Sequence, residues 1–64
     1  MAITLKAARV NAGLNQTQAA KVIGVTKDIL SNWERGISYP SVKYLPMIEA
    51  AYGLKYDQII FFQK

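Results

Sequence analysis

Apolar residues recur at three- and four-residue spacings in several stretches of this 64-residue chain. That period predicts amphipathic helices, each burying one apolar stripe in a shared core. We expect an all-α, compact bundle of about five short helices that occupies residues 1–64 as a single domain, because so short a chain has room for one core only. The expected helices span Thr4–Ala12, two segments within residues 16–35 that meet at Gly24, Ser41–Tyr52, and Tyr56–Phe61. The residues expected to face inward are Leu5, Ala8, Ala19, Ala20, Ile23, Leu30, Trp33, Leu45, Ile48, Tyr52, Ile59 and Ile60.

Residues that favour helix ends lie at several of these boundaries. Asn15, with Gln18 three positions later, has the pattern of a capping box, and Thr26 is suited to cap the helix after Gly24. Gly24 itself can adopt the positive φ of a tight helix exit. Pro46 lies inside the fourth expected helix, where it removes one backbone hydrogen bond, so we expect it to bend or split that helix.

The third expected helix carries a polar face opposite Leu30 and Trp33. An isolated polar stripe of this kind is most often a solvated surface. Here, however, two capped helices are joined by a glycine turn, and the polar residues lie near the start of the second helix. This is the arrangement of a helix-turn-helix that inserts its second helix into the major groove of DNA. The polar residues are Lys27, Asp28, Ser31, Asn32 and Arg35.

Several short motifs follow one another in a characteristic order and spacing. They are Leu5-x-x-Ala8-Arg9, Gly13-Leu14-Asn15-Gln16, Ala20, Ile23-Gly24-Val25-Thr26, Leu30-Ser31-Asn32-Trp33-Glu34-Arg35-Gly36, Pro40-Ser41, and Gly53-Leu54 before Tyr56-Asp57-Gln58-Ile59-Ile60. Together they resemble the phage repressor and Cro class of helix-turn-helix regulators, also called the Xre-like family. The resemblance covers nearly the whole chain and implies a lambda-repressor-like fold, an operator of double-stranded DNA and a homodimer.

Base recognition is expected from Lys27, Asp28, Ser31 and Asn32. Lysine can donate to guanine, asparagine can pair with adenine, and aspartate can accept from cytosine. The Asp28 carboxylate has two interpretations: it restricts the sequences that bind, or it pairs with Lys27. Ile29 lies between polar neighbours, where it either flanks the core, which is the more frequent arrangement, or meets a thymine methyl group.

Contacts with the DNA backbone are expected from other residues. In the family the glutamine that matches Gln16 touches the backbone, and the start of the second helix favours a phosphate. The alternative is that Gln16 is a capping side chain in solvent. Arg35, Lys43 and Tyr39 are the other expected backbone contacts.

The resemblance also implies a structural ion pair between Arg9 and Glu34. The alternative is that both are solvated surface charges, worth under about 1 kcal/mol as a pair. We prefer the ion pair, in which case Arg9 is not a DNA contact.

The C-terminal segment offers a dimer interface, since such proteins commonly bind two half-sites about 34 Å apart. Tyr56, Phe61 and Phe62 are the expected interface residues, with packing against the fourth helix as the alternative.

Charge and composition narrow the class of protein. The net charge of +4 favours a polyanionic partner, and residues 1–35 hold five cations against two acids. The chain has no cysteine and no histidine, and its four acids form no pair on one helix face, so we expect no catalytic site, no metal and no cofactor. No apolar run reaches the roughly 20 residues that span a bilayer, and no signal peptide is evident, so we expect a cytoplasmic protein with neither membrane contact nor small-molecule substrate.

The sequence therefore predicts a sequence-specific DNA-binding transcriptional regulator. The simplest form is a Cro-like repressor that occupies a pseudo-palindromic operator with its third helix in the major groove. The alternative is a protein-interaction module of the same fold, antitoxin-like or antirepressor, with weak DNA binding.

Overall fold

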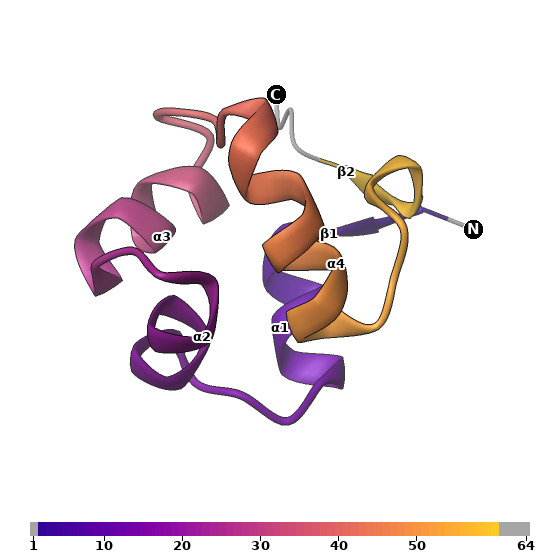
Figure 1. Ribbon diagram of the computed structural model, residues 1–64, viewed down its shortest axis with the longest axis horizontal. Helices are drawn as coiled ribbons and strands as arrows, with labels where there is room; N and C mark the ends of the chain where they lie inside the picture. Colours follow the sequence, from indigo (N-terminus) through magenta and orange to yellow (C-terminus); the bar gives the residue numbers. More distant parts are fainter. Residues whose placement is uncertain (1, 61–64) are drawn as a thin grey trace.

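The computed structural model describes residues 2–60, which form a mainly helical bundle with one small sheet (Figure 1). Helices α2 and α3 lie together on one side of the bundle, α1 and α4 lie between them and the sheet, and strands β1 and β2 lie on the other side. The elements are β1 (Ile3–Thr4), α1 (Leu5–Asn11), α2 (Gln16–Ile23), α3 (Lys27–Glu34), the 3-10 helix η1 (Val42–Tyr44), α4 (Leu45–Tyr52), the 3-10 helix η2 (Tyr56–Gln58) and β2 (Ile59–Ile60).

The caps of α2 and α3 form as the sequence predicts. The Asn15 side chain accepts from the Gln18 amide at 2.8 Å, and the Gln18 side chain accepts from the Asn15 amide at 3.0 Å, which completes the capping box. Gly24 ends α2 with φ 94°, and Thr26 Oγ1 accepts from the Ile29 amide at 3.2 Å at the start of α3. These local bonds fix the turn between α2 and α3 and thus the direction in which α3 leaves it.

One apolar core joins all four α-helices, and α2 packs against both α3 and α4. Ala19 and Ala20 of α2 are both buried, and side chains this small allow a close approach of neighbouring helices. Leu45, expected to be buried, is only partly so. The buried apolar residues are Leu5, Ala8, Ala19, Ala20, Ile23, Leu30, Trp33, Ile48, Tyr52 and Ile59.

The helix expected over Ser41–Tyr52 is split, as Pro46 suggested. The first part is η1, and α4 begins at Leu45, with Pro46 in its first turn. A proline is tolerated there because the first amides of a helix have no partner within it. Ser41 lies at the N-cap position of η1, but its side chain makes no capping bond there.

The prediction of a helix over Tyr56–Phe61 is wrong for the part of this segment that the structure describes. The chain makes one turn, η2, and then extends as β2, which pairs in parallel with β1 through Ile3 with Ile59 and Thr4 with Ile60. Consecutive β-branched residues favour this extended backbone. Because side chains alternate along a strand, Ile59 is buried while Ile60 is 40% exposed, so the prediction that both face inward holds for Ile59 only.

Candidate nucleic-acid interface

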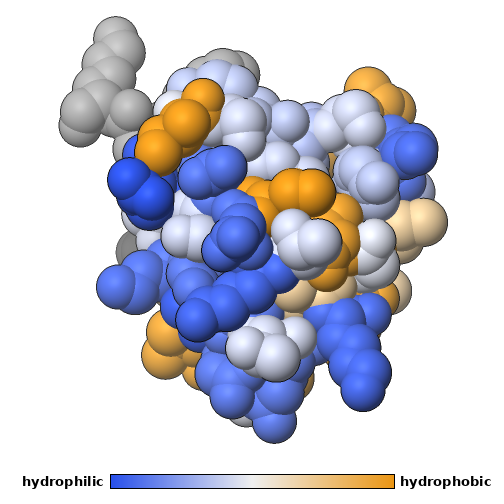
Figure 2. Space-filling view, turned by 90° about the vertical axis from the view of Figure 1, so that its left-hand side faces the viewer, coloured by the Kyte–Doolittle hydropathy of each residue, from blue (hydrophilic) through white to orange (hydrophobic). Residues whose placement is uncertain are grey.

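Helix α3 is fixed by its apolar side. Leu30 is completely buried, and Trp33 packs in the core with its ring centroid 5.6 Å from that of Tyr44. The opposite side of the helix must then face solvent. Figure 2 views the molecule from the side where α2 and α3 lie and shows a mostly hydrophilic surface with smaller apolar patches.

The structure brings the four residues expected to read bases together on this free side of α3. Lys27 and Asp28 are exposed, and Ser31 and Asn32, one turn further along, are partly exposed. Within residues 2–60 their side chains make no hydrogen bond or ion pair with the protein, so Lys27 and Asp28 are not paired with each other. Ile29 is 42% exposed, so the interpretation that it flanks the core is wrong.

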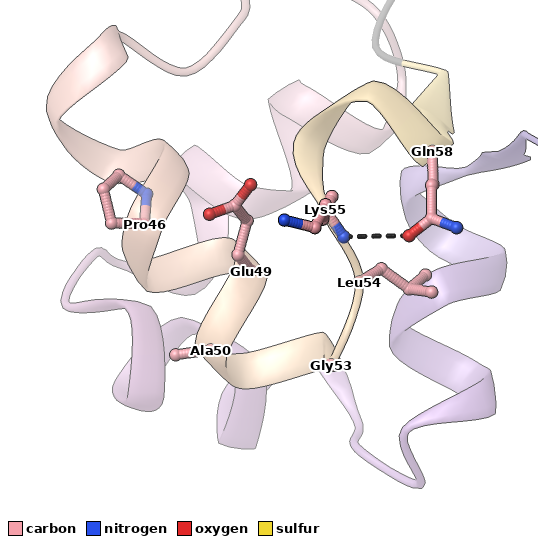
Figure 3. Close-up of a pocket in the computed structure, with 7 residues that line it drawn as sticks. All are labelled: Pro46, Glu49, Ala50, Gly53, Leu54, Lys55 and Gln58. Carbon is pink, nitrogen blue, oxygen red and sulfur yellow. Dashed lines mark hydrogen bonds between the residues drawn. The ribbon is translucent and has the colours of Figure 1, made fainter.

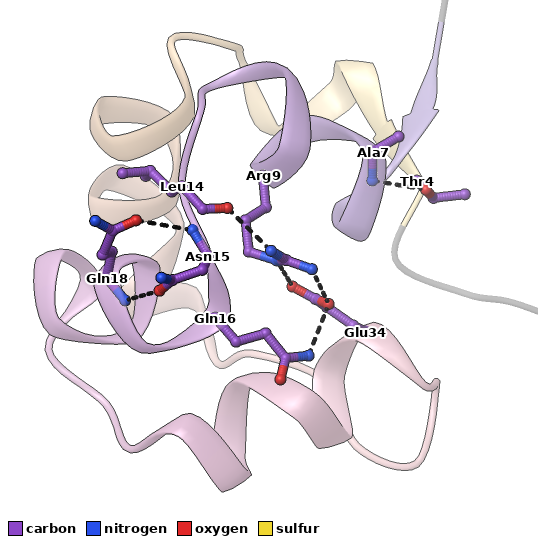
Figure 4. Close-up of polar contacts among 8 residues, drawn as sticks. All are labelled: Thr4, Ala7, Arg9, Leu14, Asn15, Gln16, Gln18 and Glu34. Carbon is purple, nitrogen blue, oxygen red and sulfur yellow. Dashed lines mark hydrogen bonds and ion pairs between the residues drawn. The ribbon is translucent and has the colours of Figure 1, made fainter.

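Arg9 and Glu34 form a buried ion pair that joins α1 to the end of α3 (Figure 4). Arg9 Nε donates to Glu34 Oε2 at 2.7 Å, and Nη2 donates to Oε1 at 3.3 Å. Arg9 Nη1 also donates to the carbonyl oxygen of Leu14 at 2.9 Å, in the turn before α2. The alternative of two solvated charges is therefore wrong, and the pair holds three parts of the domain together.

Gln16, at the start of α2, also joins this ion pair. Its Nε2 donates to Glu34 Oε1 at 3.1 Å (Figure 4). Capping of α2 is carried out by Asn15 and Gln18 instead, so the alternative of Gln16 as a capping side chain in solvent is wrong. Sequence reasoning missed this contact because the two residues lie 18 positions apart and no local pattern links them.

The remaining residues expected to contact the DNA backbone lie after the reading residues of α3. Arg35 is the exposed C-cap of that helix. Lys43 is exposed on η1, with its Nζ 5.0 Å from the centre of the Tyr44 ring. Tyr39 lies in the loop between α3 and η1 and is also exposed. The segment that follows α3 thus presents two cations and one phenol.

The sequence model of the Cro/C1-type helix-turn-helix family matches residues 5–59. The chain belongs to this family. The family consists of non-enzymatic DNA-binding domains, so the chain is a DNA-binding helix-turn-helix domain and not an enzyme. The resemblance inferred from the motifs and the predicted fold class are thereby confirmed. Searches of curated proteins and of solved structures each returned no significant match.

Tyr52 is a buried polar residue of the helix-turn-helix domain that sequence reasoning placed in the core without noting its hydroxyl group. The hydroxyl is buried and has no hydrogen-bond partner within residues 2–60. The pKa of this hydroxyl is raised from 10 to about 12, mainly by burial and also by the nearby Glu34 carboxylate, while Arg9 acts in the opposite direction. Tyr52 is therefore neutral at ordinary pH and contributes an apolar ring to the core.

A hollow of about 550 Å³ lies between α4 and η2, on a part of the domain separate from α3 (Figure 3). Its polar groups already bind the chain: Glu49 Oε2 accepts from the Tyr56 amide at 2.8 Å, and Gln58 Oε1 accepts from the Lys55 amide at 3.0 Å. The hollow therefore offers few unused polar groups to a ligand. It is lined by Pro46, Glu49, Ala50, Gly53, Leu54, Lys55 and Gln58.

The expected dimer interface of the helix-turn-helix domain can be located only in part. Tyr56 is 53% exposed on η2, while Phe61 and Phe62 lie outside the described residues.

Within the described residues, no group of three His, Cys, Asp or Glu side chains is arranged to hold a metal ion. In the same part of the chain, no helix is long and apolar enough to cross a membrane.

Proposed function

We propose that this helix-turn-helix domain is a sequence-specific transcriptional regulator, most simply a Cro-like repressor that blocks transcription by occupying its operator. One observation carries the proposal: the free side of α3 presents four polar side chains that no group within residues 2–60 binds. An ordinary solvated helix has the same chemistry, but the family membership and the capped turn before α3 favour the major groove as its environment.

Within the groove, the polar side chains of α3 contact the edges of the bases. Lys27 donates to guanine O6 or N7, and Asn32 makes a pair of hydrogen bonds with adenine. The Ser31 hydroxyl can bond to guanine or to adenine, so it discriminates less between them. Asp28 accepts from cytosine N4 and is repelled by phosphates when no such donor is present, so it narrows the range of sequences that bind. Because Ile29 is exposed beside these residues, it is available to a thymine methyl group.

The backbone contacts position α3 and carry no sequence information. The first amides of α2 have no partner within the helix and, with its dipole, attract a phosphate near Gln16. Arg35, Lys43 and Tyr39 reach the backbone from the segment after α3. These contacts make binding strongly dependent on salt.

A homodimer completes the proposal, because two half-sites one helical turn apart require two copies of α3. Tyr56 on η2, with Phe61 and Phe62 beyond it in the sequence, is the proposed contact between copies. The dimer would bind its operator in the cytoplasm.

The alternative function is a protein-interaction module of the antitoxin or antirepressor type. Exposed apolar side chains after α3 favour it, since Ile37 is 60% and Val42 is 81% exposed. Apolar side chains in this position suit a protein partner better than a phosphate. In that case DNA binding would be weak and independent of sequence.

Fluorescence anisotropy with the DNA upstream of the chain's own gene, against scrambled DNA at two salt concentrations, distinguishes the two functions. A regulator binds its own site at least about a thousandfold more tightly, with a steep salt slope. Asn32→Ala should weaken binding by about 1–3 kcal/mol and relax specificity. Asn11→Ala, the same change on an exposed residue of α1, serves as the control. Equal, weak binding to both DNAs would exclude autoregulation at that site and favour the interaction module.

A further inference from the structure

The Gln16 side chain is held in place before any DNA is bound. Its amide nitrogen, Nε2, carries two hydrogens, and one of them is donated to Glu34 Oε1 at 3.1 Å. We propose that Glu34 is a positioning residue for DNA binding: it holds the Gln16 amide so that the second N–H is directed to a phosphate oxygen. This inference rests on the proposed function, in which Gln16 contacts the DNA backbone.

The chemistry of the carboxylate determines which way the Gln16 amide faces. A carboxylate only accepts hydrogen bonds, so the amide must turn its nitrogen, and not its oxygen, toward Glu34. The reverse orientation would place two acceptors in contact. A glutamine free to rotate would present a donor to the phosphate only part of the time, and its ordering would oppose binding. With Glu34 in place, the Gln16 side chain is ordered when the protein folds, so its ordering does not oppose DNA binding.

Arg9 makes this arrangement compatible with DNA. An unpaired carboxylate close to a phosphate would repel it, but Arg9 binds both oxygens of Glu34 and cancels the charge. Arg9 also holds the Leu14 carbonyl group in the turn that leads into α2. The ion pair thus fixes both the side chain of Gln16 and the backbone from which it extends (Figure 4).

A variant that removes the whole ion pair provides the test. Arg9→Met with Glu34→Met replaces a buried pair by apolar side chains, which proteins often tolerate without loss of stability. One cation and one anion are lost together, so the net charge stays at +4 and the general attraction to DNA is preserved. The effect of Gln16→Ala on DNA affinity is then measured by anisotropy in the wild-type background and in the Met/Met background.

We expect Gln16→Ala to weaken binding about tenfold in the wild-type background, as for one hydrogen bond to a charged group, and less than about threefold in the Met/Met background. Lys43→Ala is the matched control, because Lys43 is a proposed backbone contact outside the network, and its effect should be equal in both backgrounds. An equal effect of Gln16→Ala in the two backgrounds would overturn the proposal. If Gln16→Ala and Lys43→Ala both lost their effect in the Met/Met background, the proposal would also be overturned. The Arg9–Glu34 ion pair would then support DNA binding by the whole domain and not the Gln16 contact in particular.

A second measurement uses no DNA. Nitrogen-15 relaxation of the Gln16 side-chain amide should show it rigid in the wild-type protein and mobile in the Met/Met variant. Equal mobility in the two proteins would refute the anchoring by Glu34. If the wild-type chain bound no DNA in a salt-dependent way, the proposed function would fail, while the relaxation data would still decide whether Glu34 holds the amide. Should the Met/Met variant not fold, Glu34→Asp keeps the charge but shortens the side chain, and the same loss of rigidity is expected.

Discussion

Removal of the Glu34 carboxylate should destabilise the domain severely. The Arg9 and Glu34 side chains are only 10% and 3% exposed, and the carboxylate accepts hydrogen bonds from both Arg9 and Gln16. Glu34→Ala leaves the Arg9 cation buried without its partner, which costs about 3–5 kcal/mol. A chain of 64 residues has a free energy of unfolding of about 3–10 kcal/mol in total. The variant should therefore melt at least about 12 °C lower than the wild type.

The same reasoning predicts that a second substitution, at Arg9, recovers most of the lost free energy of unfolding. Adding Arg9→Met to Glu34→Met removes the uncompensated charge, so the free energy of unfolding should return to within about 1 kcal/mol of the wild type or exceed it. Urea unfolding followed by the fluorescence of Trp33, the one tryptophan of the chain and a buried residue, measures both effects. All variants are compared at one protein concentration, because dimer formation would contribute to the measured stability.

Glu49→Ala serves as the control for loss of a carboxylate. Within residues 2–60, Glu49 accepts one exposed side-chain hydrogen bond, from the Tyr56 amide, so its removal should cost no more than about 1 kcal/mol. If Glu34→Ala also cost less than about 1 kcal/mol, the ion pair would behave as a solvated pair and the argument from burial would be refuted. The argument would fail equally if the double variant were as unstable as Glu34→Ala.

Four further predictions concern three single residues. Tyr52→Phe removes a buried hydroxyl that has no partner within residues 2–60, so chemical denaturation should show a stability equal to or up to about 1–2 kcal/mol above that of the wild type. A marked loss of stability would indicate a hydrogen bond to this hydroxyl. Because its folded pKa of about 12 exceeds the unfolded value of 10, the contribution of Tyr52 is fully present below pH 10 and is lost as the pH rises from about 10 to 12. This alkaline decline in the free energy of unfolding should be weaker in Tyr52→Phe, and identical declines would contradict the shift. Gly24→Ala should cost about 1–2 kcal/mol in urea unfolding through its φ of 94° alone, since the added Cβ would have no atom within 4 Å in the described residues beyond its chain neighbours. An unchanged midpoint would count against this backbone. Asn15→Ala should cost about 1 kcal/mol by the same assay, whereas no loss would mean that the capping box is dispensable.

The features predicted correctly from the sequence are those determined by nearby residues. Asn15 and Gln18 cap α2, Gly24 ends it and Thr26 caps α3, and each acts within a few positions of the helix end it controls. The same holds for Pro46, which has no backbone N–H to donate and therefore lies in the first turn of α4. The composition of the polar side of α3 follows from the spacing of Leu30 and Trp33 along the same helix, so it could be predicted as well.

The features that the sequence did not reveal depend on contacts between distant segments. Ile59 and Ile60 are β-branched and favour an extended backbone, but so short an apolar pair also fits a short helix, and the pairing with β1 stabilises the strand. The bond between Gln16 and Glu34 likewise needs the crossing of α2 and α3, which no residue pattern specifies. Ile29 was expected beside the core because apolar residues are usually buried, but its angular position on α3 turns it outward.

The charges around α3 suggest that different residues of the proposed complex provide affinity and specificity. Lys27 and Asp28, side by side at the start of α3, sum to no net charge, so the part of the helix that enters the groove gains little from the general attraction of DNA. That attraction must come from the flanking cations, Arg35 and Lys43, together with the positive end of α2. The salt dependence of binding should therefore follow the flanking residues, while discrimination between bases depends on α3. A neutral reading surface is suited to this division, because a strongly basic α3 would bind every sequence more tightly and reduce the relative advantage of the operator.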